Sequence, residues 1–312
     1  MVHAAIRLMV PLLLAAVGGL FTECAGVLNI ALEGLMLFGA FAAVVTAAAT
    51  GSVAAAILAA AAAAGALAFL YGLAALRLRA NIFVAGIATN LLASGLTTVL
   101  ADRLFGYKGV VRFESFPSLR PMVSAAALEP LGPAGALLRL FLDQTPLVPL
   151  AWLLVAVAWL ILEKTPFGLR LKGTGSAPEV VASVGINPDR HRIAAIALSG
   201  VACGVAGASL ALSLQAFVPN LTAGRGWIAL VIIYLGQRRI GGVVAASLLF
   251  ALAESFSNYS QGFLALPSQI VLAFPYALSL AALVGYSIWS ARRRRRAAPA
   301  TQQARAVRSP DP

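Results

Sequence analysis

Two pairs of polar side chains, each a carboxylate and an amide four residues apart, interrupt apolar stretches of this chain. Glu33 follows Asn29 in GVLNIALEGLMLFGA, and Asn258 follows Glu254 in ALAESFSNYSQ. On an α-helix, residues four apart project from the same face. A charged side chain at the centre of a bilayer costs about 3 kcal/mol on insertion scales, so each pair should face protein or water rather than lipid.

These groups suit a polar, uncharged ligand, because amides and carboxylates can bond to hydroxyl groups and to the edges of nucleobases. Asn90 adds a third amide in the apolar stretch GIATNLLASG. The alternative is that such groups bond to neighbouring helices and hold a bundle together. We favour a substrate path for Glu33 and Glu254 and leave both roles open for Asn90. The candidate path residues are Asn29, Glu33, Asn90, Glu254 and Asn258.

The composition is that of an integral membrane protein. Hydrophobic residues make up 61% of the 312 residues and charged residues 11%, and the mean hydropathy is +0.91. Long apolar runs separated by short polar loops favour helices, because a membrane barrel would show alternating segments of about ten residues. The sequence therefore predicts an all-α, polytopic membrane bundle, with no separate soluble domain.

About nine stretches, or eight to ten, reach the length that a helix needs to cross a bilayer. The predicted spans are roughly 6–22, 26–49, 52–75, 81–101, 146–163, 193–214, 222–236, 240–258 and 269–291. The stretch 222–236 is short for a bilayer, which favours a broken or half-length helix of the kind that lines transporter paths. A second, re-entrant break is possible near 22–29. Residues 1–291 would form one transmembrane domain.

The basic residues predict the orientation of the bundle. Most of the 23 Lys and Arg gather in loops that can share one side, which should be the cytoplasm. They are Arg77, Arg79, those of the 164–192 loop, Arg238, Arg239 and those of the C-terminal tail. This arrangement puts the C-terminus in the cytoplasm and the N-terminus outside, and it explains the net charge of +12 without nucleic acid.

Two further segments lie outside the predicted spans. The nearly neutral loop 102–145 should be external, where it either docks a partner or serves as a connector. Residues 292–312, RRRRRAAPATQQARAVRSPDP, predict a disordered basic cytoplasmic tail whose arginines contact anionic lipid.

The chain lacks the motifs of several enzyme classes. It has no Gly-rich phosphate loop ending in Gly-Lys-Ser/Thr, no H-E-x-x-H and no G-x-S-x-G. Cys24 and Cys203 predict small buried side chains, and we expect no metal site, no cofactor and no catalytic residue. Any ATP hydrolysis belongs to another chain. Glu23, with the other intramembrane carboxylates, keeps a proton-coupled secondary transporter open as an alternative.

The loop 164–192, KTPFGLRLKGTGSAPEVVASVGINPDRHR, predicts a short amphipathic helix outside the membrane. Ser176 should cap it, with Pro178 and Glu179 in the first turn, and Gly185 should end it. Its apolar positions are Val180, Val181 and Val184. From spacing alone, such a helix could rest on the bilayer or dock into a partner.

This loop, with the following ALSGVACGVAGASLALS, resembles the cytoplasmic signature of ABC importer permeases of the branched-chain amino acid, ribose and nucleoside group. TECAGVLNIALEGLMLFGAFAA and RLRANIFVAGIATNLLASGLTTVL most resemble the smaller permease subunit of nucleoside-type importers. The resemblance runs from about Leu20 to Tyr286.

The resemblance implies one half of a heterodimeric channel in the bacterial cytoplasmic membrane. An ATPase subunit would bind the coupling helix, and an extracytoplasmic lipoprotein would deliver the substrate. The coupling residues would be Ser176, Pro178, Glu179, Val180, Val181, Val184 and Gly185. A nucleoside is the expected substrate; a ribose-like sugar or a branched-chain amino acid is the alternative.

Overall fold

The computed structural model describes residues 2–106, 110–112 and 145–260, together with residues 277, 280, 281, 284 and 285. Within these residues, seven helices are long and apolar enough to cross a membrane. The predicted polytopic helical bundle is confirmed. The predicted last span at 269–291, the basic tail and most of the loop 102–145 lie outside the described residues.

The predicted spans up to residue 260 correspond to observed helices. The seven long ones are α1 (Val2–Cys24), α2 (Leu32–Thr50), α3 (Val53–Leu76), α4 (Ile82–Phe105), α7 (Leu147–Lys164), α10 (Pro188–Leu214) and α12 (Ile240–Ser260). The shorter elements are α8 (Pro166–Ser176), α9 (Pro178–Ser183), α11 (Arg225–Leu235), β1 (Val111–Arg112) and β2 (Ala216–Phe217).

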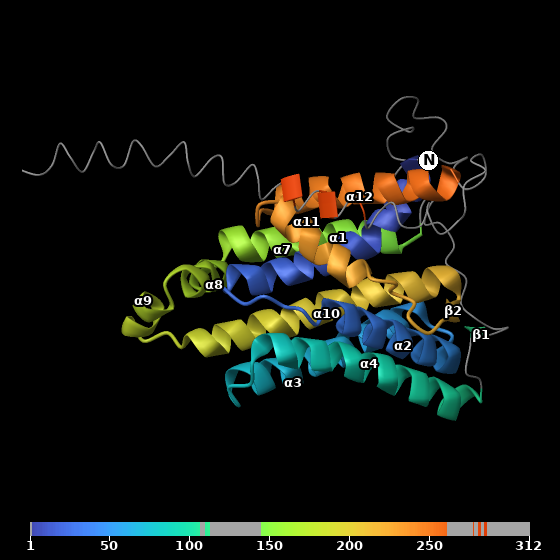
Figure 1. Ribbon diagram of the computed structural model, residues 1–312, viewed down its shortest axis with the longest axis horizontal. Coiled ribbons are helices and arrows are strands. Elements are labelled where there is room, and N and C mark those ends of the chain that lie inside the picture. The colour runs from blue at the N-terminus through green and yellow to red at the C-terminus, as the bar shows by residue number, and fades with distance from the viewer. Residues whose placement is uncertain are drawn as a thin grey trace, which may run out of the picture.

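The bundle has two distinct ends (Figure 1). At one end α8 and α9 project beyond the long helices; we call this the α9 end. At the other end β1 pairs antiparallel with β2, and Phe217 of β2 packs edge-on against Phe41 of α2 at a centroid distance of 5.2 Å. We call this the ribbon end.

Helix α10 forms the centre of the bundle and packs against α1, α2 and α3. The close packing depends on small residues: a Cβ on Gly204 would lie 2.9 Å from the Cβ of Ala64 in α3 and 2.8 Å from the carbonyl carbon of Ala60. Small residues let helix backbones approach in this way in membrane proteins. Larger side chains at this position would push α10 away from α3.

Two helices begin in the middle of the bundle rather than at its ends. After α1 reaches the α9 end, residues 25–31 return to mid-depth without helical structure, and α2 starts there and runs to the ribbon end (Figure 1). After α10 and β2, residues 218–224 return from the ribbon end, and α11 starts at mid-depth and runs to the α9 end. The half-length helix that the sequence predicts is α11. The break that the sequence left open near 22–29 lies at 25–31, so α2 begins at Leu32 rather than at the predicted 26, and the N-termini of α2 and α11 meet.

The α9 end contains one helix that the sequence did not predict. Thr165 caps α8 by accepting a hydrogen bond from the amide of Gly168 at 3.2 Å, and Pro166 occupies the first turn. Helix α10 also begins earlier than the predicted 193, because Asn187 caps it through the amides of Asp189 and Arg190.

The predicted capping role of Ser176 is wrong. Ser176 is the last residue of α8, and its hydroxyl donates to the carbonyl of Lys172 at 2.9 Å. The backbone of α8 continues through Ser176, so the hydroxyl bonds back one turn instead of capping α9. Ala177 is the N-cap of α9 and makes no side-chain cap, whereas Gly185 follows the helix with the positive φ of 80° that favours glycine.

Candidate substrate path

Glu33 holds the start of α11 in place. Its Oε1 accepts hydrogen bonds from the hydroxyl of Thr222 at 2.5 Å and from the amide of Gly224 at 2.8 Å, and its Oε2 accepts from the amide of Gly226 at 2.7 Å. Gly224 is the N-cap of α11 and has no side chain to cap with. The carboxylate therefore supplies the anionic cap from another helix, where both the free N–H groups and the helix dipole favour it.

The same carboxylate lies in the first turn of its own helix, α2. Gly226 permits this approach, because a Cβ there would lie 2.5 Å from the backbone nitrogen and Cα of Glu33. One acidic group thus serves two helix N-termini that meet at mid-depth. Substrate and ion sites in transporters form where interrupted helices place their termini at mid-depth in this way.

Asn29 fixes the non-helical segment that precedes α2. Its side chain is buried, its Nδ2 donates to the hydroxyl of Ser199 at 3.0 Å, and its Oδ1 accepts from the amide of Ala31 at 3.0 Å. The first bond connects the segment to α10. The second gives an acceptor to the amide of Ala31, which precedes α2 and has no acceptor within a helix. Asn29 therefore shapes the break.

Asn90 supports the start of α2 from the side of α4. Its Oδ1 accepts from the amide of Gly34 at 2.7 Å, and its Nδ2 donates to the carbonyl of Ile30 at 3.0 Å. Both partners are backbone groups left without an intrahelical bond near a helix N-terminus. Asn90 therefore makes the bonds between helices that hold a bundle together. Its path-lining role remains a prediction.

Glu254 of α12 pairs with Arg225, the first residue of α11. Arg225 Nη2 donates to Glu254 Oε1 at 2.5 Å, and Nη1 donates to the carbonyl of Thr222 at 3.4 Å. The side chains are 21% and 14% exposed, respectively. The two predicted polar stripes are thus connected through the first turn of α11. Asn258, one turn further along α12, is exposed.

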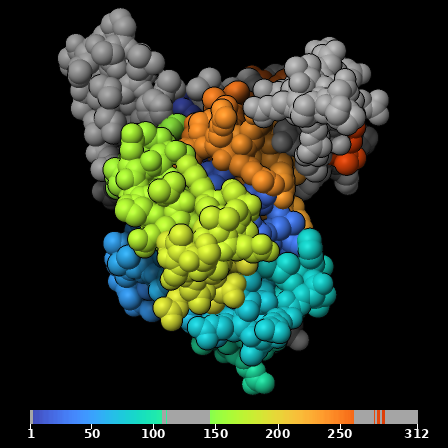
Figure 2. Space-filling model, turned by 90° about the vertical axis from the view of Figure 1, so that its left-hand side faces the viewer, coloured from blue at the N-terminus to red at the C-terminus, as the bar shows by residue number. Residues whose placement is uncertain are grey.

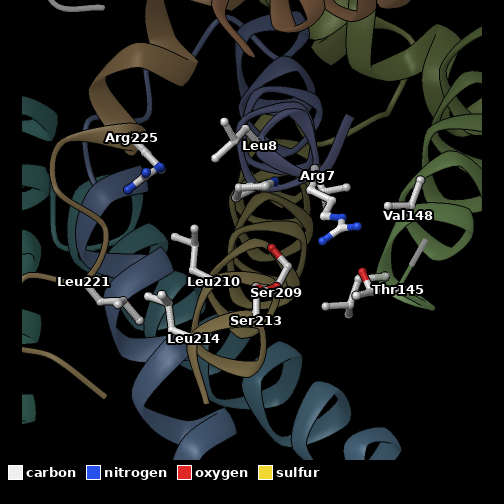
Figure 3. A pocket seen from close by; sticks show the side chains of 13 residues that line it. Arg7, Leu8, Thr145, Val148, Ser209, Leu210, Ser213, Leu214, Leu221 and Arg225 are labelled. Atoms are coloured by element: carbon white, nitrogen blue, oxygen red, sulfur yellow. The ribbon is translucent and has the colours of Figure 1, made fainter. Parts of the chain in front are cut away.

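A cavity opens beside this cluster toward the ribbon end (Figure 3). Its volume is ≈ 190 Å³, and α1, α7, α10 and the segment 221–225 form its walls. Its polar lining residues are Arg7, Thr145, Ser209, Ser213 and Arg225; the others are apolar.

A second polar cavity of ≈ 450 Å³ lies at the α9 end, between the end of α1 and α8. Glu23 on its wall forms an ion pair with Arg238 at 2.6 Å and accepts a hydrogen bond from the hydroxyl of Tyr234 at 3.3 Å. Among the described residues, no group of three or more His, Cys, Asp or Glu side chains lies close enough to hold a metal.

Helix α9 and its C-cap residue, Val184, present an apolar surface that is exposed. Val180 and Val184 are 63% and 68% exposed. Val181 is half-buried and lies beside Gly173 of α8. Viewed from this end, α8 and α9 stand in front of the long helices, with α12 to one side and the turn between α3 and α4 to the other (Figure 2).

The sequence matches the protein family described as "Branched-chain amino acid transport system / permease component" over residues 1–294. The chain belongs to this permease family. The guanosine ABC transporter permease NupQ of Bacillus subtilis is 33% identical over 88% of each chain. The nucleoside ABC transporter permease NupC of Lactococcus lactis is 32% identical over 88% of this chain and 87% of its own.

Another relative of the permease carries a different substrate name. The putative glucose ABC transporter permease TsgC13 of Haloferax volcanii is 32% identical over 84% of this chain and 78% of its own. No solved structure matches the permease. The family match and the apolar helices make the chain a multi-pass membrane transport subunit.

Sequence reasoning missed three residues of the permease that complete the site: Ser199, Thr222 and Arg225. Arg225 carried a usable signal, because an arginine that opens a short apolar helix needs an acidic partner. Ser199 and Thr222 gave no such signal, since hydroxyl groups are common in membrane helices and usually bond to their own backbone.

Proposed function

We propose that this chain is one permease subunit of an ATP-driven ABC importer that passes nucleosides across the bacterial cytoplasmic membrane. The observation that carries the proposal is the meeting of the N-termini of α2 and α11 at the cluster formed by Glu33, Arg225 and Glu254. In transporters, substrate sites form where broken helices end at mid-depth. The substrate class rests on the names of the two bacterial relatives.

The α9 end would face the cytoplasm. The turn after α3, the α8 to α10 connection and the turn before α12 carry basic residues and lie at this end. They include Arg77, Arg79, Arg170, Lys172, Arg238 and Arg239. Lysine and arginine are retained on the cytoplasmic side of membrane proteins, so the N-terminus would lie outside. The C-terminus would lie inside, as the sequence predicts.

Within the path, we assign different tasks to the predicted residues. Three of them form hydrogen bonds to backbone groups and neighbouring side chains, so they would shape the path wall: Asn29, Asn90 and Glu33. Glu254 does not line the cavity itself, but it pairs with Arg225, which does, and of the predicted residues it would lie closest to the substrate. Asn258, on the same helix, would extend the path toward the outside.

The partners follow from the same proposal. The exposed apolar surface of α9 would dock into an ATPase subunit, which hydrolyses ATP in place of this chain. The coupling surface would comprise Pro178, Glu179, Val180, Val181, Val184 and Gly185, while Ser176 would contribute only through α8. A second permease subunit and an extracytoplasmic substrate-binding lipoprotein complete the importer.

The test is uptake by the complete importer in proteoliposomes. The chain is co-expressed with the ATPase, the second permease and the lipoprotein of its importer, and uptake of labelled nucleosides, ribose and leucine is compared. We expect ATP-dependent uptake of nucleosides. A preference for leucine would contradict the substrate class, and uptake by the single chain driven by a pH gradient without ATP would contradict the importer itself.

A sugar is the second candidate substrate, because TsgC13 is a putative glucose permease at nearly the same identity as the nucleoside relatives. Ribose uptake without nucleoside uptake in the same assay would favour it.

A further inference from the structure

The cavity at the ribbon end combines an apolar wall with fixed hydrogen-bond donors and acceptors. Leu8, Leu210 and Leu221 contribute to the apolar part. Ser209 and Ser213 donate their hydroxyl protons to helix carbonyls at 2.7 and 2.6 Å, which leaves their oxygen lone pairs as acceptors. Such a lining, mainly apolar with a few placed polar groups, is typical of small-molecule sites.

Arg225 is a lining residue that is held in place by two hydrogen bonds. Glu254 and the Thr222 carbonyl each take one of the five N–H donors of its guanidinium, the first from Nη2 and the second from Nη1. Its Nε is buried and has no acceptor among the described residues. A ligand in the cavity cannot reach this buried Nε–H, so the second N–H groups of Nη1 and Nη2 are the ones that remain for it. Arg225 is therefore positioned and still has N–H groups to offer.

The cavity is too small for a whole nucleoside. Its volume of ≈ 190 Å³ is below the roughly 300 Å³ at which sites for drug-sized ligands begin. A planar base, however, would present its ring faces to the leucine side chains and its edge to the arginine. Figure 3 shows Arg225 reaching from the start of α11 on one side, with Ser209 and Arg7 on the other side of Leu210.

We propose that this cavity receives the base of the transported nucleoside and that Arg225 selects 6-oxopurines, such as guanine and hypoxanthine, over adenine. The inference rests on the proposed function and adds a specificity residue to it. A guanidinium only donates, and its fork matches the adjacent O6 and N7 acceptors of a 6-oxopurine. Adenine presents an amino donor at position 6, which leaves one arginine N–H without an acceptor.

The experiment measures a selectivity ratio in the complete importer. Guanosine and adenosine uptake are compared in proteoliposomes at concentrations that saturate the lipoprotein, so that the ratio reports on the permease. We expect Arg225→Gln to lower the guanosine to adenosine ratio by about tenfold or more, because a glutamine amide pairs with the N6 and N7 of adenine. An unchanged ratio in an assembled Arg225→Gln importer overturns the inference.

Arg238→Gln is the matched control. It removes an arginine from an ion pair with a glutamate, Glu23, at the opposite end of the bundle. Its guanosine to adenosine ratio should equal that of the wild type. A fall as large as that of Arg225→Gln would show that the ratio reports on the loss of any such pair, which also overturns the inference.

A second variant decides the matter if Arg225→Gln does not assemble. Ser213 is exposed and borders the cavity without contacting Arg225, so Ser213→Phe should fill the space and slow guanosine uptake at least tenfold. Normal guanosine uptake by this variant overturns the inference. A wild-type importer that takes up no nucleoside contradicts the proposed function itself, whereas nucleoside uptake with an unaltered ratio contradicts only the role of Arg225.

Discussion

At the scale of single residues, the carboxylate of Glu33 has three protein donors, two of them backbone amides. A carboxylate has about four acceptor positions, so most of its capacity is in use. Its charge also lies at two helix N-termini, which favour an anion. These contacts stabilise the carboxylate at mid-depth without requiring a ligand.

Replacing Glu33 tests whether this residue acts as a cap. In Glu33→Gln, one carboxylate oxygen becomes an NH₂ donor that faces an N–H or O–H donor, so we expect the bundle to lose about 1–3 kcal/mol of stability. Thermal unfolding in detergent, followed by size-exclusion chromatography, measures this loss, and uptake should fall with it.

Glu163→Gln is the control for this prediction. Glu163 pairs with Lys172 at 2.6 Å, but its side chain is 49% exposed, and exposed pairs contribute about 0–1 kcal/mol. If Glu33→Gln is as stable as the wild type and yet transports nothing, the carboxylate contacts substrate and the capping interpretation is wrong.

At the scale of elements, the apolar runs predicted the long helices well, because burial in lipid leaves a strong signal in composition. Helix α8 was missed, since PFGLRLKGTGS is polar and contains three glycines, and its packing against α7, α10 and α1 leaves no pattern in the sequence. The pairing of Arg225 with Glu254 could not be predicted, because it depends on how the non-helical segment 218–224 folds back. Pattern and propensity do not determine such tertiary contacts.

The exposed surface of α9 carries the prediction at this scale. Val180→Asp combined with Val184→Asp places two charges on the apolar surface, and we expect at least a tenfold loss of ATPase co-purification and of uptake. Val181→Asp is less informative, because it would disturb the packing of α9 against Gly173 of α8.

Asn187→Asp serves as the control for α9. It adds negative charge to the same connection, and aspartate caps a helix as well as asparagine does, so α10 should be unaffected. Normal co-purification of the ATPase with the double valine variant would show that α9 does not belong to the coupling surface.

At the scale of the whole molecule, α1 with α2 and α10 with α11 follow the same plan in opposite directions. In each pair a long helix crosses the bundle, an irregular segment returns to mid-depth, and a second helix completes the crossing. The two pairs start from opposite ends of the bundle. Labelling of one exposed residue at each end can test which end faces the cytoplasm.

Cysteine labelling provides this test after Cys24 and Cys203 have been replaced. Thr50→Cys at the ribbon end should react with an impermeant maleimide from outside the cell, and Ser183→Cys in α9 only after the membrane is opened. Both residues are exposed, so the contrast reports on sidedness rather than burial. The reverse labelling pattern would show that the α9 end faces outside, which contradicts the proposed orientation.

The shared cap has a mechanical consequence. Glu33 moves with α2, while its three donors move with the segment that leads into α11. A motion that parts these segments must break all three bonds together and leave both helix termini without their anion. We therefore expect the junction to stay closed during small thermal fluctuations. It would open only in a rearrangement that breaks the three bonds together.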